Sequence, residues 1–211
     1  MSAKRPAPLR PLPPGSVIGI VGAGQLGRLL CLAAARLGLR TAVLGPAGSP
    51  AAQVCDILVE GREDDPLGIE HLARLSHVLT FESENAPADV LEAISRTVPV
   101  EPDARALRVS QDRLVEKSFL NDTGAPTVAF EPVDGAADIV VALRMLGAPA
   151  VLKTRRFGYD GKGQTWIAHG DDAEAAFERV GARPCVLEQR CAFAREVSVI
   201  AVRVRDGAFA A

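Results

Sequence analysis

The sequence predicts an α/β protein in which a doubly wound parallel sheet is followed by an α+β region. Short apolar runs alternate with helix-like stretches up to about residue 102, glycine-rich turns separate them, and consecutive helix-like segments then replace the alternation. Alternating strands and helices are typical of parallel sheets, because a crossover helix joins each strand to the next. We therefore expect a disordered Pro-rich leader at residues 1–14, a first domain at 15–102 and a second domain at 103–211.

The first domain opens with a β-α-β unit. An apolar run at residues 17–21 precedes a glycine turn, a helix-like stretch at 25–37 that Gly38 is suited to end, and a second apolar run at 41–44. Further strands are expected at residues 56–59, 77–81 and 98–100, and further helices at 66–75 and 87–95. This order predicts a Rossmann-like domain.

The second domain begins with two expected helices at residues 104–109 and 111–121, which a breaker sequence at 123–126 ends. Strands are then expected at 127–130, 150–153, 164–168, 185–188 and 196–205, and helices at 136–146 and 171–180. A glycine loop joins the second and third of these strands, so we expect a mobile hairpin there. The turn signal Asp206-Gly207 lies just before Ala211, where a partner strand would begin, so we expect this domain to be incomplete.

Composition excludes several classes of protein. The chain has 24 Lys and Arg against 26 Asp and Glu, so no overall field recruits nucleic acid or an anionic membrane. No apolar run approaches the roughly 18 to 20 residues of a membrane helix, and the leader lacks the apolar core of a secretory signal. The four cysteines show no paired metal-ligand spacing, which favours reduced structural thiols. These features predict a cytoplasmic protein.

The glycine turn at residues 22–27 fits GxGxxG after a strand and before a helix, where backbone amides can hold a phosphate. A classical dinucleotide site needs an acidic residue at the end of the second strand, and Leu44-Gly45-Pro46 stands there instead. We favour a site for another phosphate-bearing ligand, which Arg28 would reinforce. A dinucleotide site and a purely structural turn stay open as alternatives.

The glycine loop follows an apolar strand. Residues 153–164 hold three glycines and four cations after Leu152, which suits a flexible loop closing over a nucleotide. The segment is not a P-loop, because GxxxxGK followed by Ser or Thr is missing. A solvated hairpin tip is the alternative. Glu188 and Glu196 are spaced as if two strands presented carboxylates toward one cleft, although a plain surface position explains them equally well.

Five motifs resemble those of one family. Residues 22–28 read GAGQLGR, 80–85 TFESEN, 112–117 DRLVEK, 151–164 VLKTRRFGYDGKGQ and 188–199 EQRCAFAREVSV. They occur in this order in the 5-(carboxyamino)imidazole ribonucleotide synthases, purine-pathway members of the ATP-grasp superfamily. The resemblance covers the chain from about residue 15 to its end. Gln25 favours this family over its formyl-transferring sibling, which typically carries Glu there.

The resemblance implies a pre-ATP-grasp domain followed by an ATP-grasp region, and it implies roles for particular residues. ATP contacts are implied for Arg113, Lys153, Gly158, Tyr159, Asp160, Gly161, Lys162, Gly163, Gln164, Glu188, Gln189, Arg190, Cys191 and Glu196. Contacts with the imidazole ribonucleotide are implied for Gly24, Gln25, Leu26 and Glu82 or Glu84, and catalytic roles for Tyr159, Asp160 and Lys162. Our hypothesis is that Asp160 assists proton removal from the substrate amine.

The implied activity is ATP-dependent carboxylation of 5-aminoimidazole ribonucleotide with bicarbonate, giving ADP and phosphate, in purine biosynthesis. The family's Mg²⁺ ligands would lie downstream of Ala211, so we expect no metal ligands in this chain and no ATPase activity from residues 1–211 alone. Small molecules would be the partners, without nucleic acid or membrane, and a homodimer stays open. The alternatives are another ATP-grasp ligase, such as formate-dependent glycinamide ribonucleotide transformylase, an NAD-binding oxidoreductase, or a non-catalytic binding module.

Overall fold

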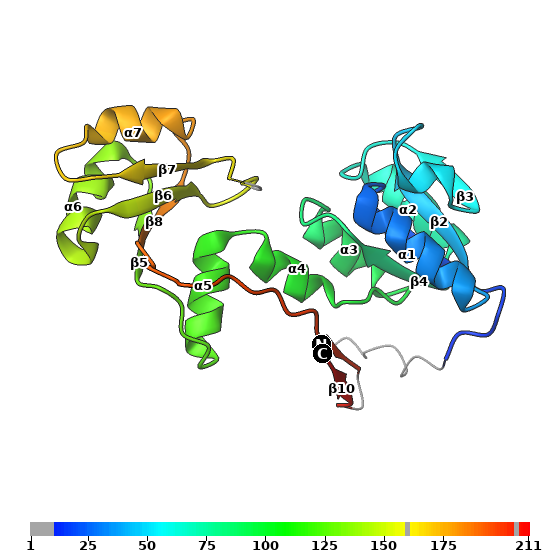
Figure 1. Cartoon of the computed structure of the whole chain (residues 1–211). Helices are drawn as coiled ribbons and strands as arrows, with labels where there is room; N and C mark the ends of the chain where they lie inside the picture. Colours follow the sequence, from blue (N-terminus) through cyan, green and yellow to red (C-terminus); the bar gives the residue numbers. More distant parts are fainter. Residues whose placement is uncertain (1–10, 159–160, 205–206) are drawn as a thin grey trace. The chain divides into compact units, whose positions relative to one another are not determined.

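The computed structural model describes residues 11–158, 161–204 and 207–211 (Figure 1). The chain divides into two compact units, Met1–Gln111 and Asp112–Ala211. Helix α4 (Ala104–Ser110), which follows residue 103, belongs to the first unit because its Ala104 and Leu107 are buried in that unit's core.

The first unit contains a four-stranded parallel sheet in the order β3-β2-β1-β4. The strands are β1 (Val17–Val21), β2 (Arg40–Gly45), β3 (Ile57–Glu60) and β4 (Val78–Phe81). This confirms the predicted parallel sheet. The strand expected at residues 98–100 is absent as such: a single parallel bridge joins Val100 to Leu79, because Pro99 has no amide proton to extend the ladder.

Helices cover both faces of this sheet. They are α1 (Gln25–Arg36), α2 (Pro66–Leu75), α3 (Ala88–Ile94) and α4, with a short 3₁₀ turn η1 (Ala51–Gln53). Neighbouring strand residues point to opposite faces, so Ile20 packs with Cys31 of α1 and Ala51 of η1, whereas Val21 packs with residues of α2, α3 and α4. Burial on both faces explains the continuous apolar runs that mark these strands in the sequence.

The second unit contains an antiparallel sheet in the order β5-β8-β6-β7. Its strands are β5 (Phe130–Val133), β6 (Ala150–Thr154), β7 (Gln164–Ile167) and β8 (Cys185–Gln189), and its helices are α5 (Arg113–Asp122), α6 (Ala136–Leu146) and α7 (Ala173–Arg179). Ile139 of α6 and Ala176 of α7 share a buried cluster with Leu152 and Leu187. Lys153 and Glu188 therefore point to the opposite face, because side chains alternate along a strand.

Two strands of the second unit differ from the sequence expectation. β5 begins at Phe130 rather than at residue 127. Of the strand expected at residues 196–205, the described part, residues 196–204, forms only β9 (Val202–Arg203), which pairs with β10 (Phe209–Ala210). Val199 and Ile200 are 73% and 86% exposed. No sheet in the described structure buries the apolar side chains of this segment. Among the described residues no helix combines the length and the apolar character needed to cross a membrane.

Candidate functional site

A buried carboxylate between two lysines lies on the face of the second sheet opposite α6 and α7. The Glu188 carboxylate on β8 accepts a hydrogen bond of 2.8 Å from Lys153 Nζ on β6, and Lys117 Nζ on α5 lies 3.4 Å from its other oxygen. The Glu188 side chain is only 8% exposed, and those of Lys117 and Lys153 are 13% and 25% exposed. We refer to Lys117, Lys153 and Glu188 as the lysine cluster.

The lysine cluster has a net positive charge in a partly desolvated place. A carboxylate buried there is stable only because two ammonium groups compensate it. Each ammonium has three donors, so the cluster keeps hydrogen-bonding capacity for an anion such as a phosphate. Lys117 also lies over the ring of Phe130, 5.4 Å from its centroid. The site reasoning from sequence missed Lys117; its place one helical turn after Arg113 was the signal that could have found it.

Arg113, expected at the nucleotide, binds backbone carbonyls. Its Nε donates to Thr154 O at 3.1 Å and its Nη2 to Gly158 O at 2.7 Å. Its own amide donates to Arg155 O at 2.9 Å. The first turn of α5 thus holds the start of the glycine loop against the sheet.

Asp112 connects the same two segments. Its carboxylate caps α5 by accepting from Leu114 N and forms a two-point ion pair with Arg155, at distances of 2.7 and 3.0 Å. Burial by itself raises the pKa of Asp112, but the hydrogen bonds from Arg155 and from the α5 amides outweigh it and hold the pKa below its ordinary value of 3.8. Two cations of this segment therefore form ion pairs within the chain: Arg155 pairs with Asp112, and Lys153 pairs with Glu188.

The Asp112→Asn variant isolates the ion pair. Asparagine keeps an oxygen that can cap α5 but loses the charge that faces Arg155. Since the folded pKa of Asp112 is depressed, its contribution to stability is present above the unfolded value of 3.8 and is lost as the pH falls through the folded value. We expect the variant to be less stable by about 1 to 2 kcal/mol at pH 7, and we expect this deficit to shrink at a pH well below 3.8, measured by urea unfolding. An equal deficit at both pH values would contradict this.

Two glycines of the loop lie around the Thr154 side chain. A Cβ at Gly163 would come within 2.5 Å of Thr154 Oγ1, and one at Gly158 within 3.0 Å. Thr154 Oγ1 is buried and has no hydrogen-bond partner among the described atoms. Gly161, Lys162 and Gln164 are exposed, while Tyr159 and Asp160 lie outside the described residues.

The predicted pair of strand-end carboxylates is not observed. Glu188 is buried in β8, whereas Glu196 is exposed in a segment without helix or strand. The expectation was wrong because the apolar residues after Glu196 lack a described neighbouring strand to pair with. Gln189, Arg190 and Cys191 are exposed at the end of β8, and Gln189 Nε2 donates to Leu146 O at 3.3 Å.

The glycine turn of the first unit holds a carboxylate of its own chain. Gly24 N donates to Glu82 Oε1 at 2.7 Å, and a Cβ at Gly22 or Gly24 would come within 2.9 Å of the Glu82 side chain. Arg28, expected to reinforce phosphate binding, donates instead to Pro50 O and Gln53 Oε1. The amide of Gly24 therefore already donates to a carboxylate of the same chain.

The neighbouring residues of this turn are partly open. Gln25, Leu26 and Glu84 are exposed, and the Glu84 carbonyl accepts from Gln111 Nε2 at 2.7 Å. Gly45 takes the place where a dinucleotide-binding protein carries its acid, and a Cβ there would lie 2.3 Å from Ala23 Cβ. Close packing of the turn on β2 therefore requires glycine at this position.

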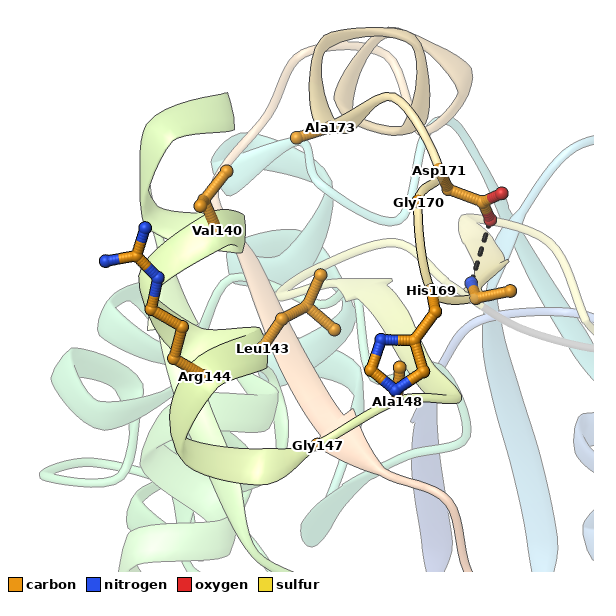
Figure 2. A pocket seen from close by; sticks show the side chains of 10 residues that line it. Val140, Leu143, Arg144, Gly147, Ala148, His169, Gly170, Asp171 and Ala173 are labelled. Atoms are coloured by element: carbon orange, nitrogen blue, oxygen red, sulfur yellow. Dashed lines mark hydrogen bonds between the residues drawn. The ribbon is translucent and has the colours of Figure 1, made fainter.

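A separate hollow of the second unit lies at the end of β7 that faces away from the glycine loop (Figure 2). It has a volume of about 490 Å³, and Leu143 and Ala173 contribute to its apolar lining. Arg144 and His169 lie on its two sides, and Asp171 accepts a hydrogen bond from Ala168 N at 2.8 Å. None of the predicted site residues lines it.

Comparison with known proteins assigns each of the two units to a domain family. The family described as "Ribonucleotide synthetase preATP-grasp domain" matches residues 16–111, and the ATP-grasp domain family matches residues 118–211. The N5-carboxyaminoimidazole ribonucleotide synthase of Brucella melitensis is 47% identical over 199 residues, which cover 93% of this chain and 55% of that relative. The chain spans about half the length of the curated relatives that it matches.

Solved structures agree with this assignment. The Staphylococcus aureus N5-carboxyaminoimidazole synthetase complexed with ADP is 32% identical, with a TM-score of 0.91 over 96% of this chain and 54% of that chain. The Aspergillus clavatus synthase in complex with ADP and 5-aminoimidazole ribonucleotide is 29% identical, with a TM-score of 0.78 over 85% of this chain and 48% of that chain. With both domain families matched in order, the chain belongs to the N5-carboxyaminoimidazole ribonucleotide synthase family of the ATP-grasp superfamily.

Proposed function

We propose that this chain acts in the ATP-dependent carboxylation of 5-aminoimidazole ribonucleotide with bicarbonate, giving N5-carboxyaminoimidazole ribonucleotide, ADP and phosphate in purine biosynthesis. The observation that carries the proposal is the lysine cluster in a domain of the ATP-grasp family. Relatives that were solved with ADP and with the ribonucleotide support the same pair of ligands.

The lysine cluster is the part of the chain that would hold the nucleotide phosphates. Lys117 and Lys153 donate to phosphate oxygens, and Glu188 keeps both ammonium groups in place when no nucleotide is bound. The end of β8, at residues 189–191, would contact the adenine side, and Glu196 the ribose. These last assignments rest on the family resemblance.

The chemistry joins three reactants in two steps. A bicarbonate oxygen attacks the γ-phosphorus and ADP leaves, which forms carboxyphosphate. The substrate amine then attacks either the carboxyl carbon of carboxyphosphate, from which phosphate leaves, or the CO₂ formed when carboxyphosphate loses phosphate, and the amine loses a proton. In our proposal the lysines stabilise the charge on the phosphates, and the glycine loop excludes water from the labile intermediate. Asp160 as the proton acceptor, Tyr159 and Lys162 as its neighbours in catalysis, and Gly158 to Gln164 as the loop are likewise proposals from the resemblance.

The ribonucleotide would bind at the glycine turn of the first unit. Glu82 has its Oε1 on Gly24 N and keeps a second oxygen that can accept from a ligand hydroxyl or amine. Gln25 and Leu26 are exposed beside it, as is Glu84. The same carboxylate disfavours the dinucleotide alternative, because a diphosphate at this turn would meet a negative charge.

Three further expectations remain proposals. The family's Mg²⁺ would supply charge neutralisation at the phosphates, and we assign it no step. Within the described ranges no three carboxylate, imidazole or thiol groups converge. A cytoplasmic location and a homodimer are proposed from the resemblance alone.

Titrating three ligands into the wild type and three variants tests the proposal. We expect the chain to bind ATP and 5-aminoimidazole ribonucleotide but not NAD, measured by calorimetry. Lys153→Ala should weaken ATP binding roughly tenfold to a hundredfold, because a charged hydrogen bond is lost, and should leave ribonucleotide binding unchanged. Glu82→Ala should show the reverse pattern, while Glu70→Ala, an exposed residue of α2, should change neither. NAD binding with no ATP binding, or equal losses of both ligands in both variants, would refute it.

A further inference from the structure

A short segment after β4 carries the two glutamates that we propose for the ribonucleotide site. We define the acidic turn as residues 82–86, which lie between β4 and α3 and form neither helix nor strand. Its first residue is attached to the rest of the unit: Glu82 N donates to Val21 O at 3.0 Å, and the Glu82 carboxylate accepts from Gly24 N at 2.7 Å. The Glu84 side chain is exposed, so its direction depends on what holds the middle of the acidic turn.

Gln111 holds the middle of the acidic turn. Its side-chain Nε2 donates to Glu84 O at 2.7 Å and to Ala86 O at 2.6 Å. A primary amide has two N–H groups, so this one side chain can meet two carbonyls at once. Nearer the start of the turn, Ser83 Oγ donates to Glu63 Oε1 at 3.0 Å. The backbone on both sides of residue 85 is thus fixed by a residue that lies more than twenty positions further along the chain.

Gln111 extends from a helix end that is anchored in the core. It directly follows α4, and Gln111 N donates to Leu107 O at 3.0 Å as a further helical residue would. Ala104 and Leu107 of this helix are each 2% exposed and pack in the core of the first unit. Residues on rigid elements place a site more precisely than residues on loops do. The position of the acidic turn is therefore linked to the core through one glutamine.

We propose that Gln111 is a positioning residue of the ribonucleotide site: it holds the acidic turn in the shape in which Glu82 and Glu84 meet the ribonucleotide. Without its two hydrogen bonds the turn would have to be ordered by the ligand, and the cost of ordering a loop lowers affinity. The inference rests on the proposed function for the purpose of the turn, but the hold of Gln111 on the turn can be measured in the ligand-free chain.

Hydrogen–deuterium exchange of the ligand-free chain measures this hold. The amides of Asn85 and Ala86, which donate to Ser83, should exchange roughly tenfold faster in Gln111→Ala because two hydrogen bonds to the turn are lost. The amides of β1 should keep their rate. Gln111→Glu has nearly the same shape but brings a carboxylate toward two carbonyl oxygens, so it should exchange at least as fast as Gln111→Ala. Arg105→Ala, which removes an exposed arginine of α4 that pairs with Asp103, should behave like the wild type.

Two exchange results would overturn the proposal. Wild-type exchange of the acidic turn in Gln111→Ala or Gln111→Glu would show that the amide donor does not hold it. Equally faster exchange in β1 and in the turn would show that Gln111 stabilises the whole unit rather than positioning the turn. Circular dichroism checks that each variant is folded.

Titration of 5-aminoimidazole ribonucleotide into the same variants tests what the hold is for. Both Gln111 variants should bind the ribonucleotide roughly fivefold to tenfold more weakly and ATP as the wild type does, whereas Arg105→Ala should change neither. Unchanged ribonucleotide affinity would overturn the proposal, because a purely structural glutamine affects stability without changing the affinity of the folded protein. If the wild type binds no ribonucleotide, the proposed function fails, and the exchange rates still decide whether Gln111 holds the turn.

A double replacement of the glutamates tests whether Gln111 acts through them. With Glu82→Ala and Glu84→Ala in place, the further change Gln111→Ala should weaken ribonucleotide binding by less than about twofold, because the groups that it positions are gone. The full loss of affinity in this background would show that Gln111 contacts the ribonucleotide directly, and the proposal would be wrong.

Discussion

Replacing Glu188 with glutamine is expected to destabilise the second unit by about 3 kcal/mol, because two partly buried ammonium groups lose their shared counter-charge. Lys117 and Lys153 lie 3.4 and 2.8 Å from that carboxylate, so without it they would repel each other. Urea unfolding followed by the fluorescence of Trp166, the only tryptophan in the chain, reports on this unit. Glu178→Gln, which neutralises an exposed carboxylate of α7, is the matched control and should stay within about 0.5 kcal/mol of the wild type.

The same variant distinguishes a structural carboxylate from one that stands beside an anion site. Phosphate oxygens can compensate the two lysines once the carboxylate is neutral, so ATP should stabilise Glu188→Gln more than it stabilises the wild type. The shift of the urea midpoint at saturating ATP measures this difference. If ATP raises the midpoint of both proteins equally, or of neither, the lysine cluster is a structural ion pair and does not receive phosphates.

The Gly163→Ala substitution is expected to lower the free energy of unfolding by about 3 kcal/mol, the second largest expected effect. Its φ of +68° is strained for alanine, and the new Cβ would lie 2.5 Å from Thr154 Oγ1, inside contact distance. Gly161→Ala is the matched control: its φ is +78°, but among the described atoms a Cβ there would meet only Gln164 Nε2, at 3.9 Å. It should cost about 1 kcal/mol.

Thermal unfolding at one protein concentration compares these two variants. The difference between them isolates the contact with Thr154, since both share the backbone strain. Equal losses would mean that the loop re-enters the sheet with enough freedom to move the new methyl group away from the threonine. A third variant, Gly163→Ala combined with Thr154→Ser, keeps the hydroxyl, so it should recover little of the loss.

The sequence was sufficient for the layered core of the first unit. Ile20 and Val21 are buried on opposite faces of the parallel sheet, and such double burial produces the uninterrupted apolar runs that predicted these strands. Helix starts were also predictable to within two residues where an aspartate caps them, as Asp112 does for α5. Local chemistry determines these features, so local patterns reveal them.

Contacts between residues that lie far apart in the sequence were harder to predict. Lys117 was not recognised as a partner of Glu188, because the pairing depends on how α5 lies over the sheet rather than on spacing along the chain. The apolar alternation after Glu196 suggested a long strand, yet a strand needs a neighbour, and in the part of the chain that the structure describes β10 pairs only with Val202 and Arg203. The hydrogen bonds from Arg113 to the carbonyls of Thr154 and Gly158 were likewise not predictable from the spacing of residues along the chain.

The bond from Gly24 to Glu82 has a consequence for how such turns are recognised. The glycine spacing fixes only the shape of the turn. A side chain 58 positions away determines whether the turn suits a negatively or a positively charged ligand. When a carboxylate such as that of Glu82 occupies the turn, a backbone shape that binds anions in other proteins would instead bind ligands that donate hydrogen bonds. A search that reads glycines alone would confuse the two, and adding the residue after the fourth strand to the pattern would separate them.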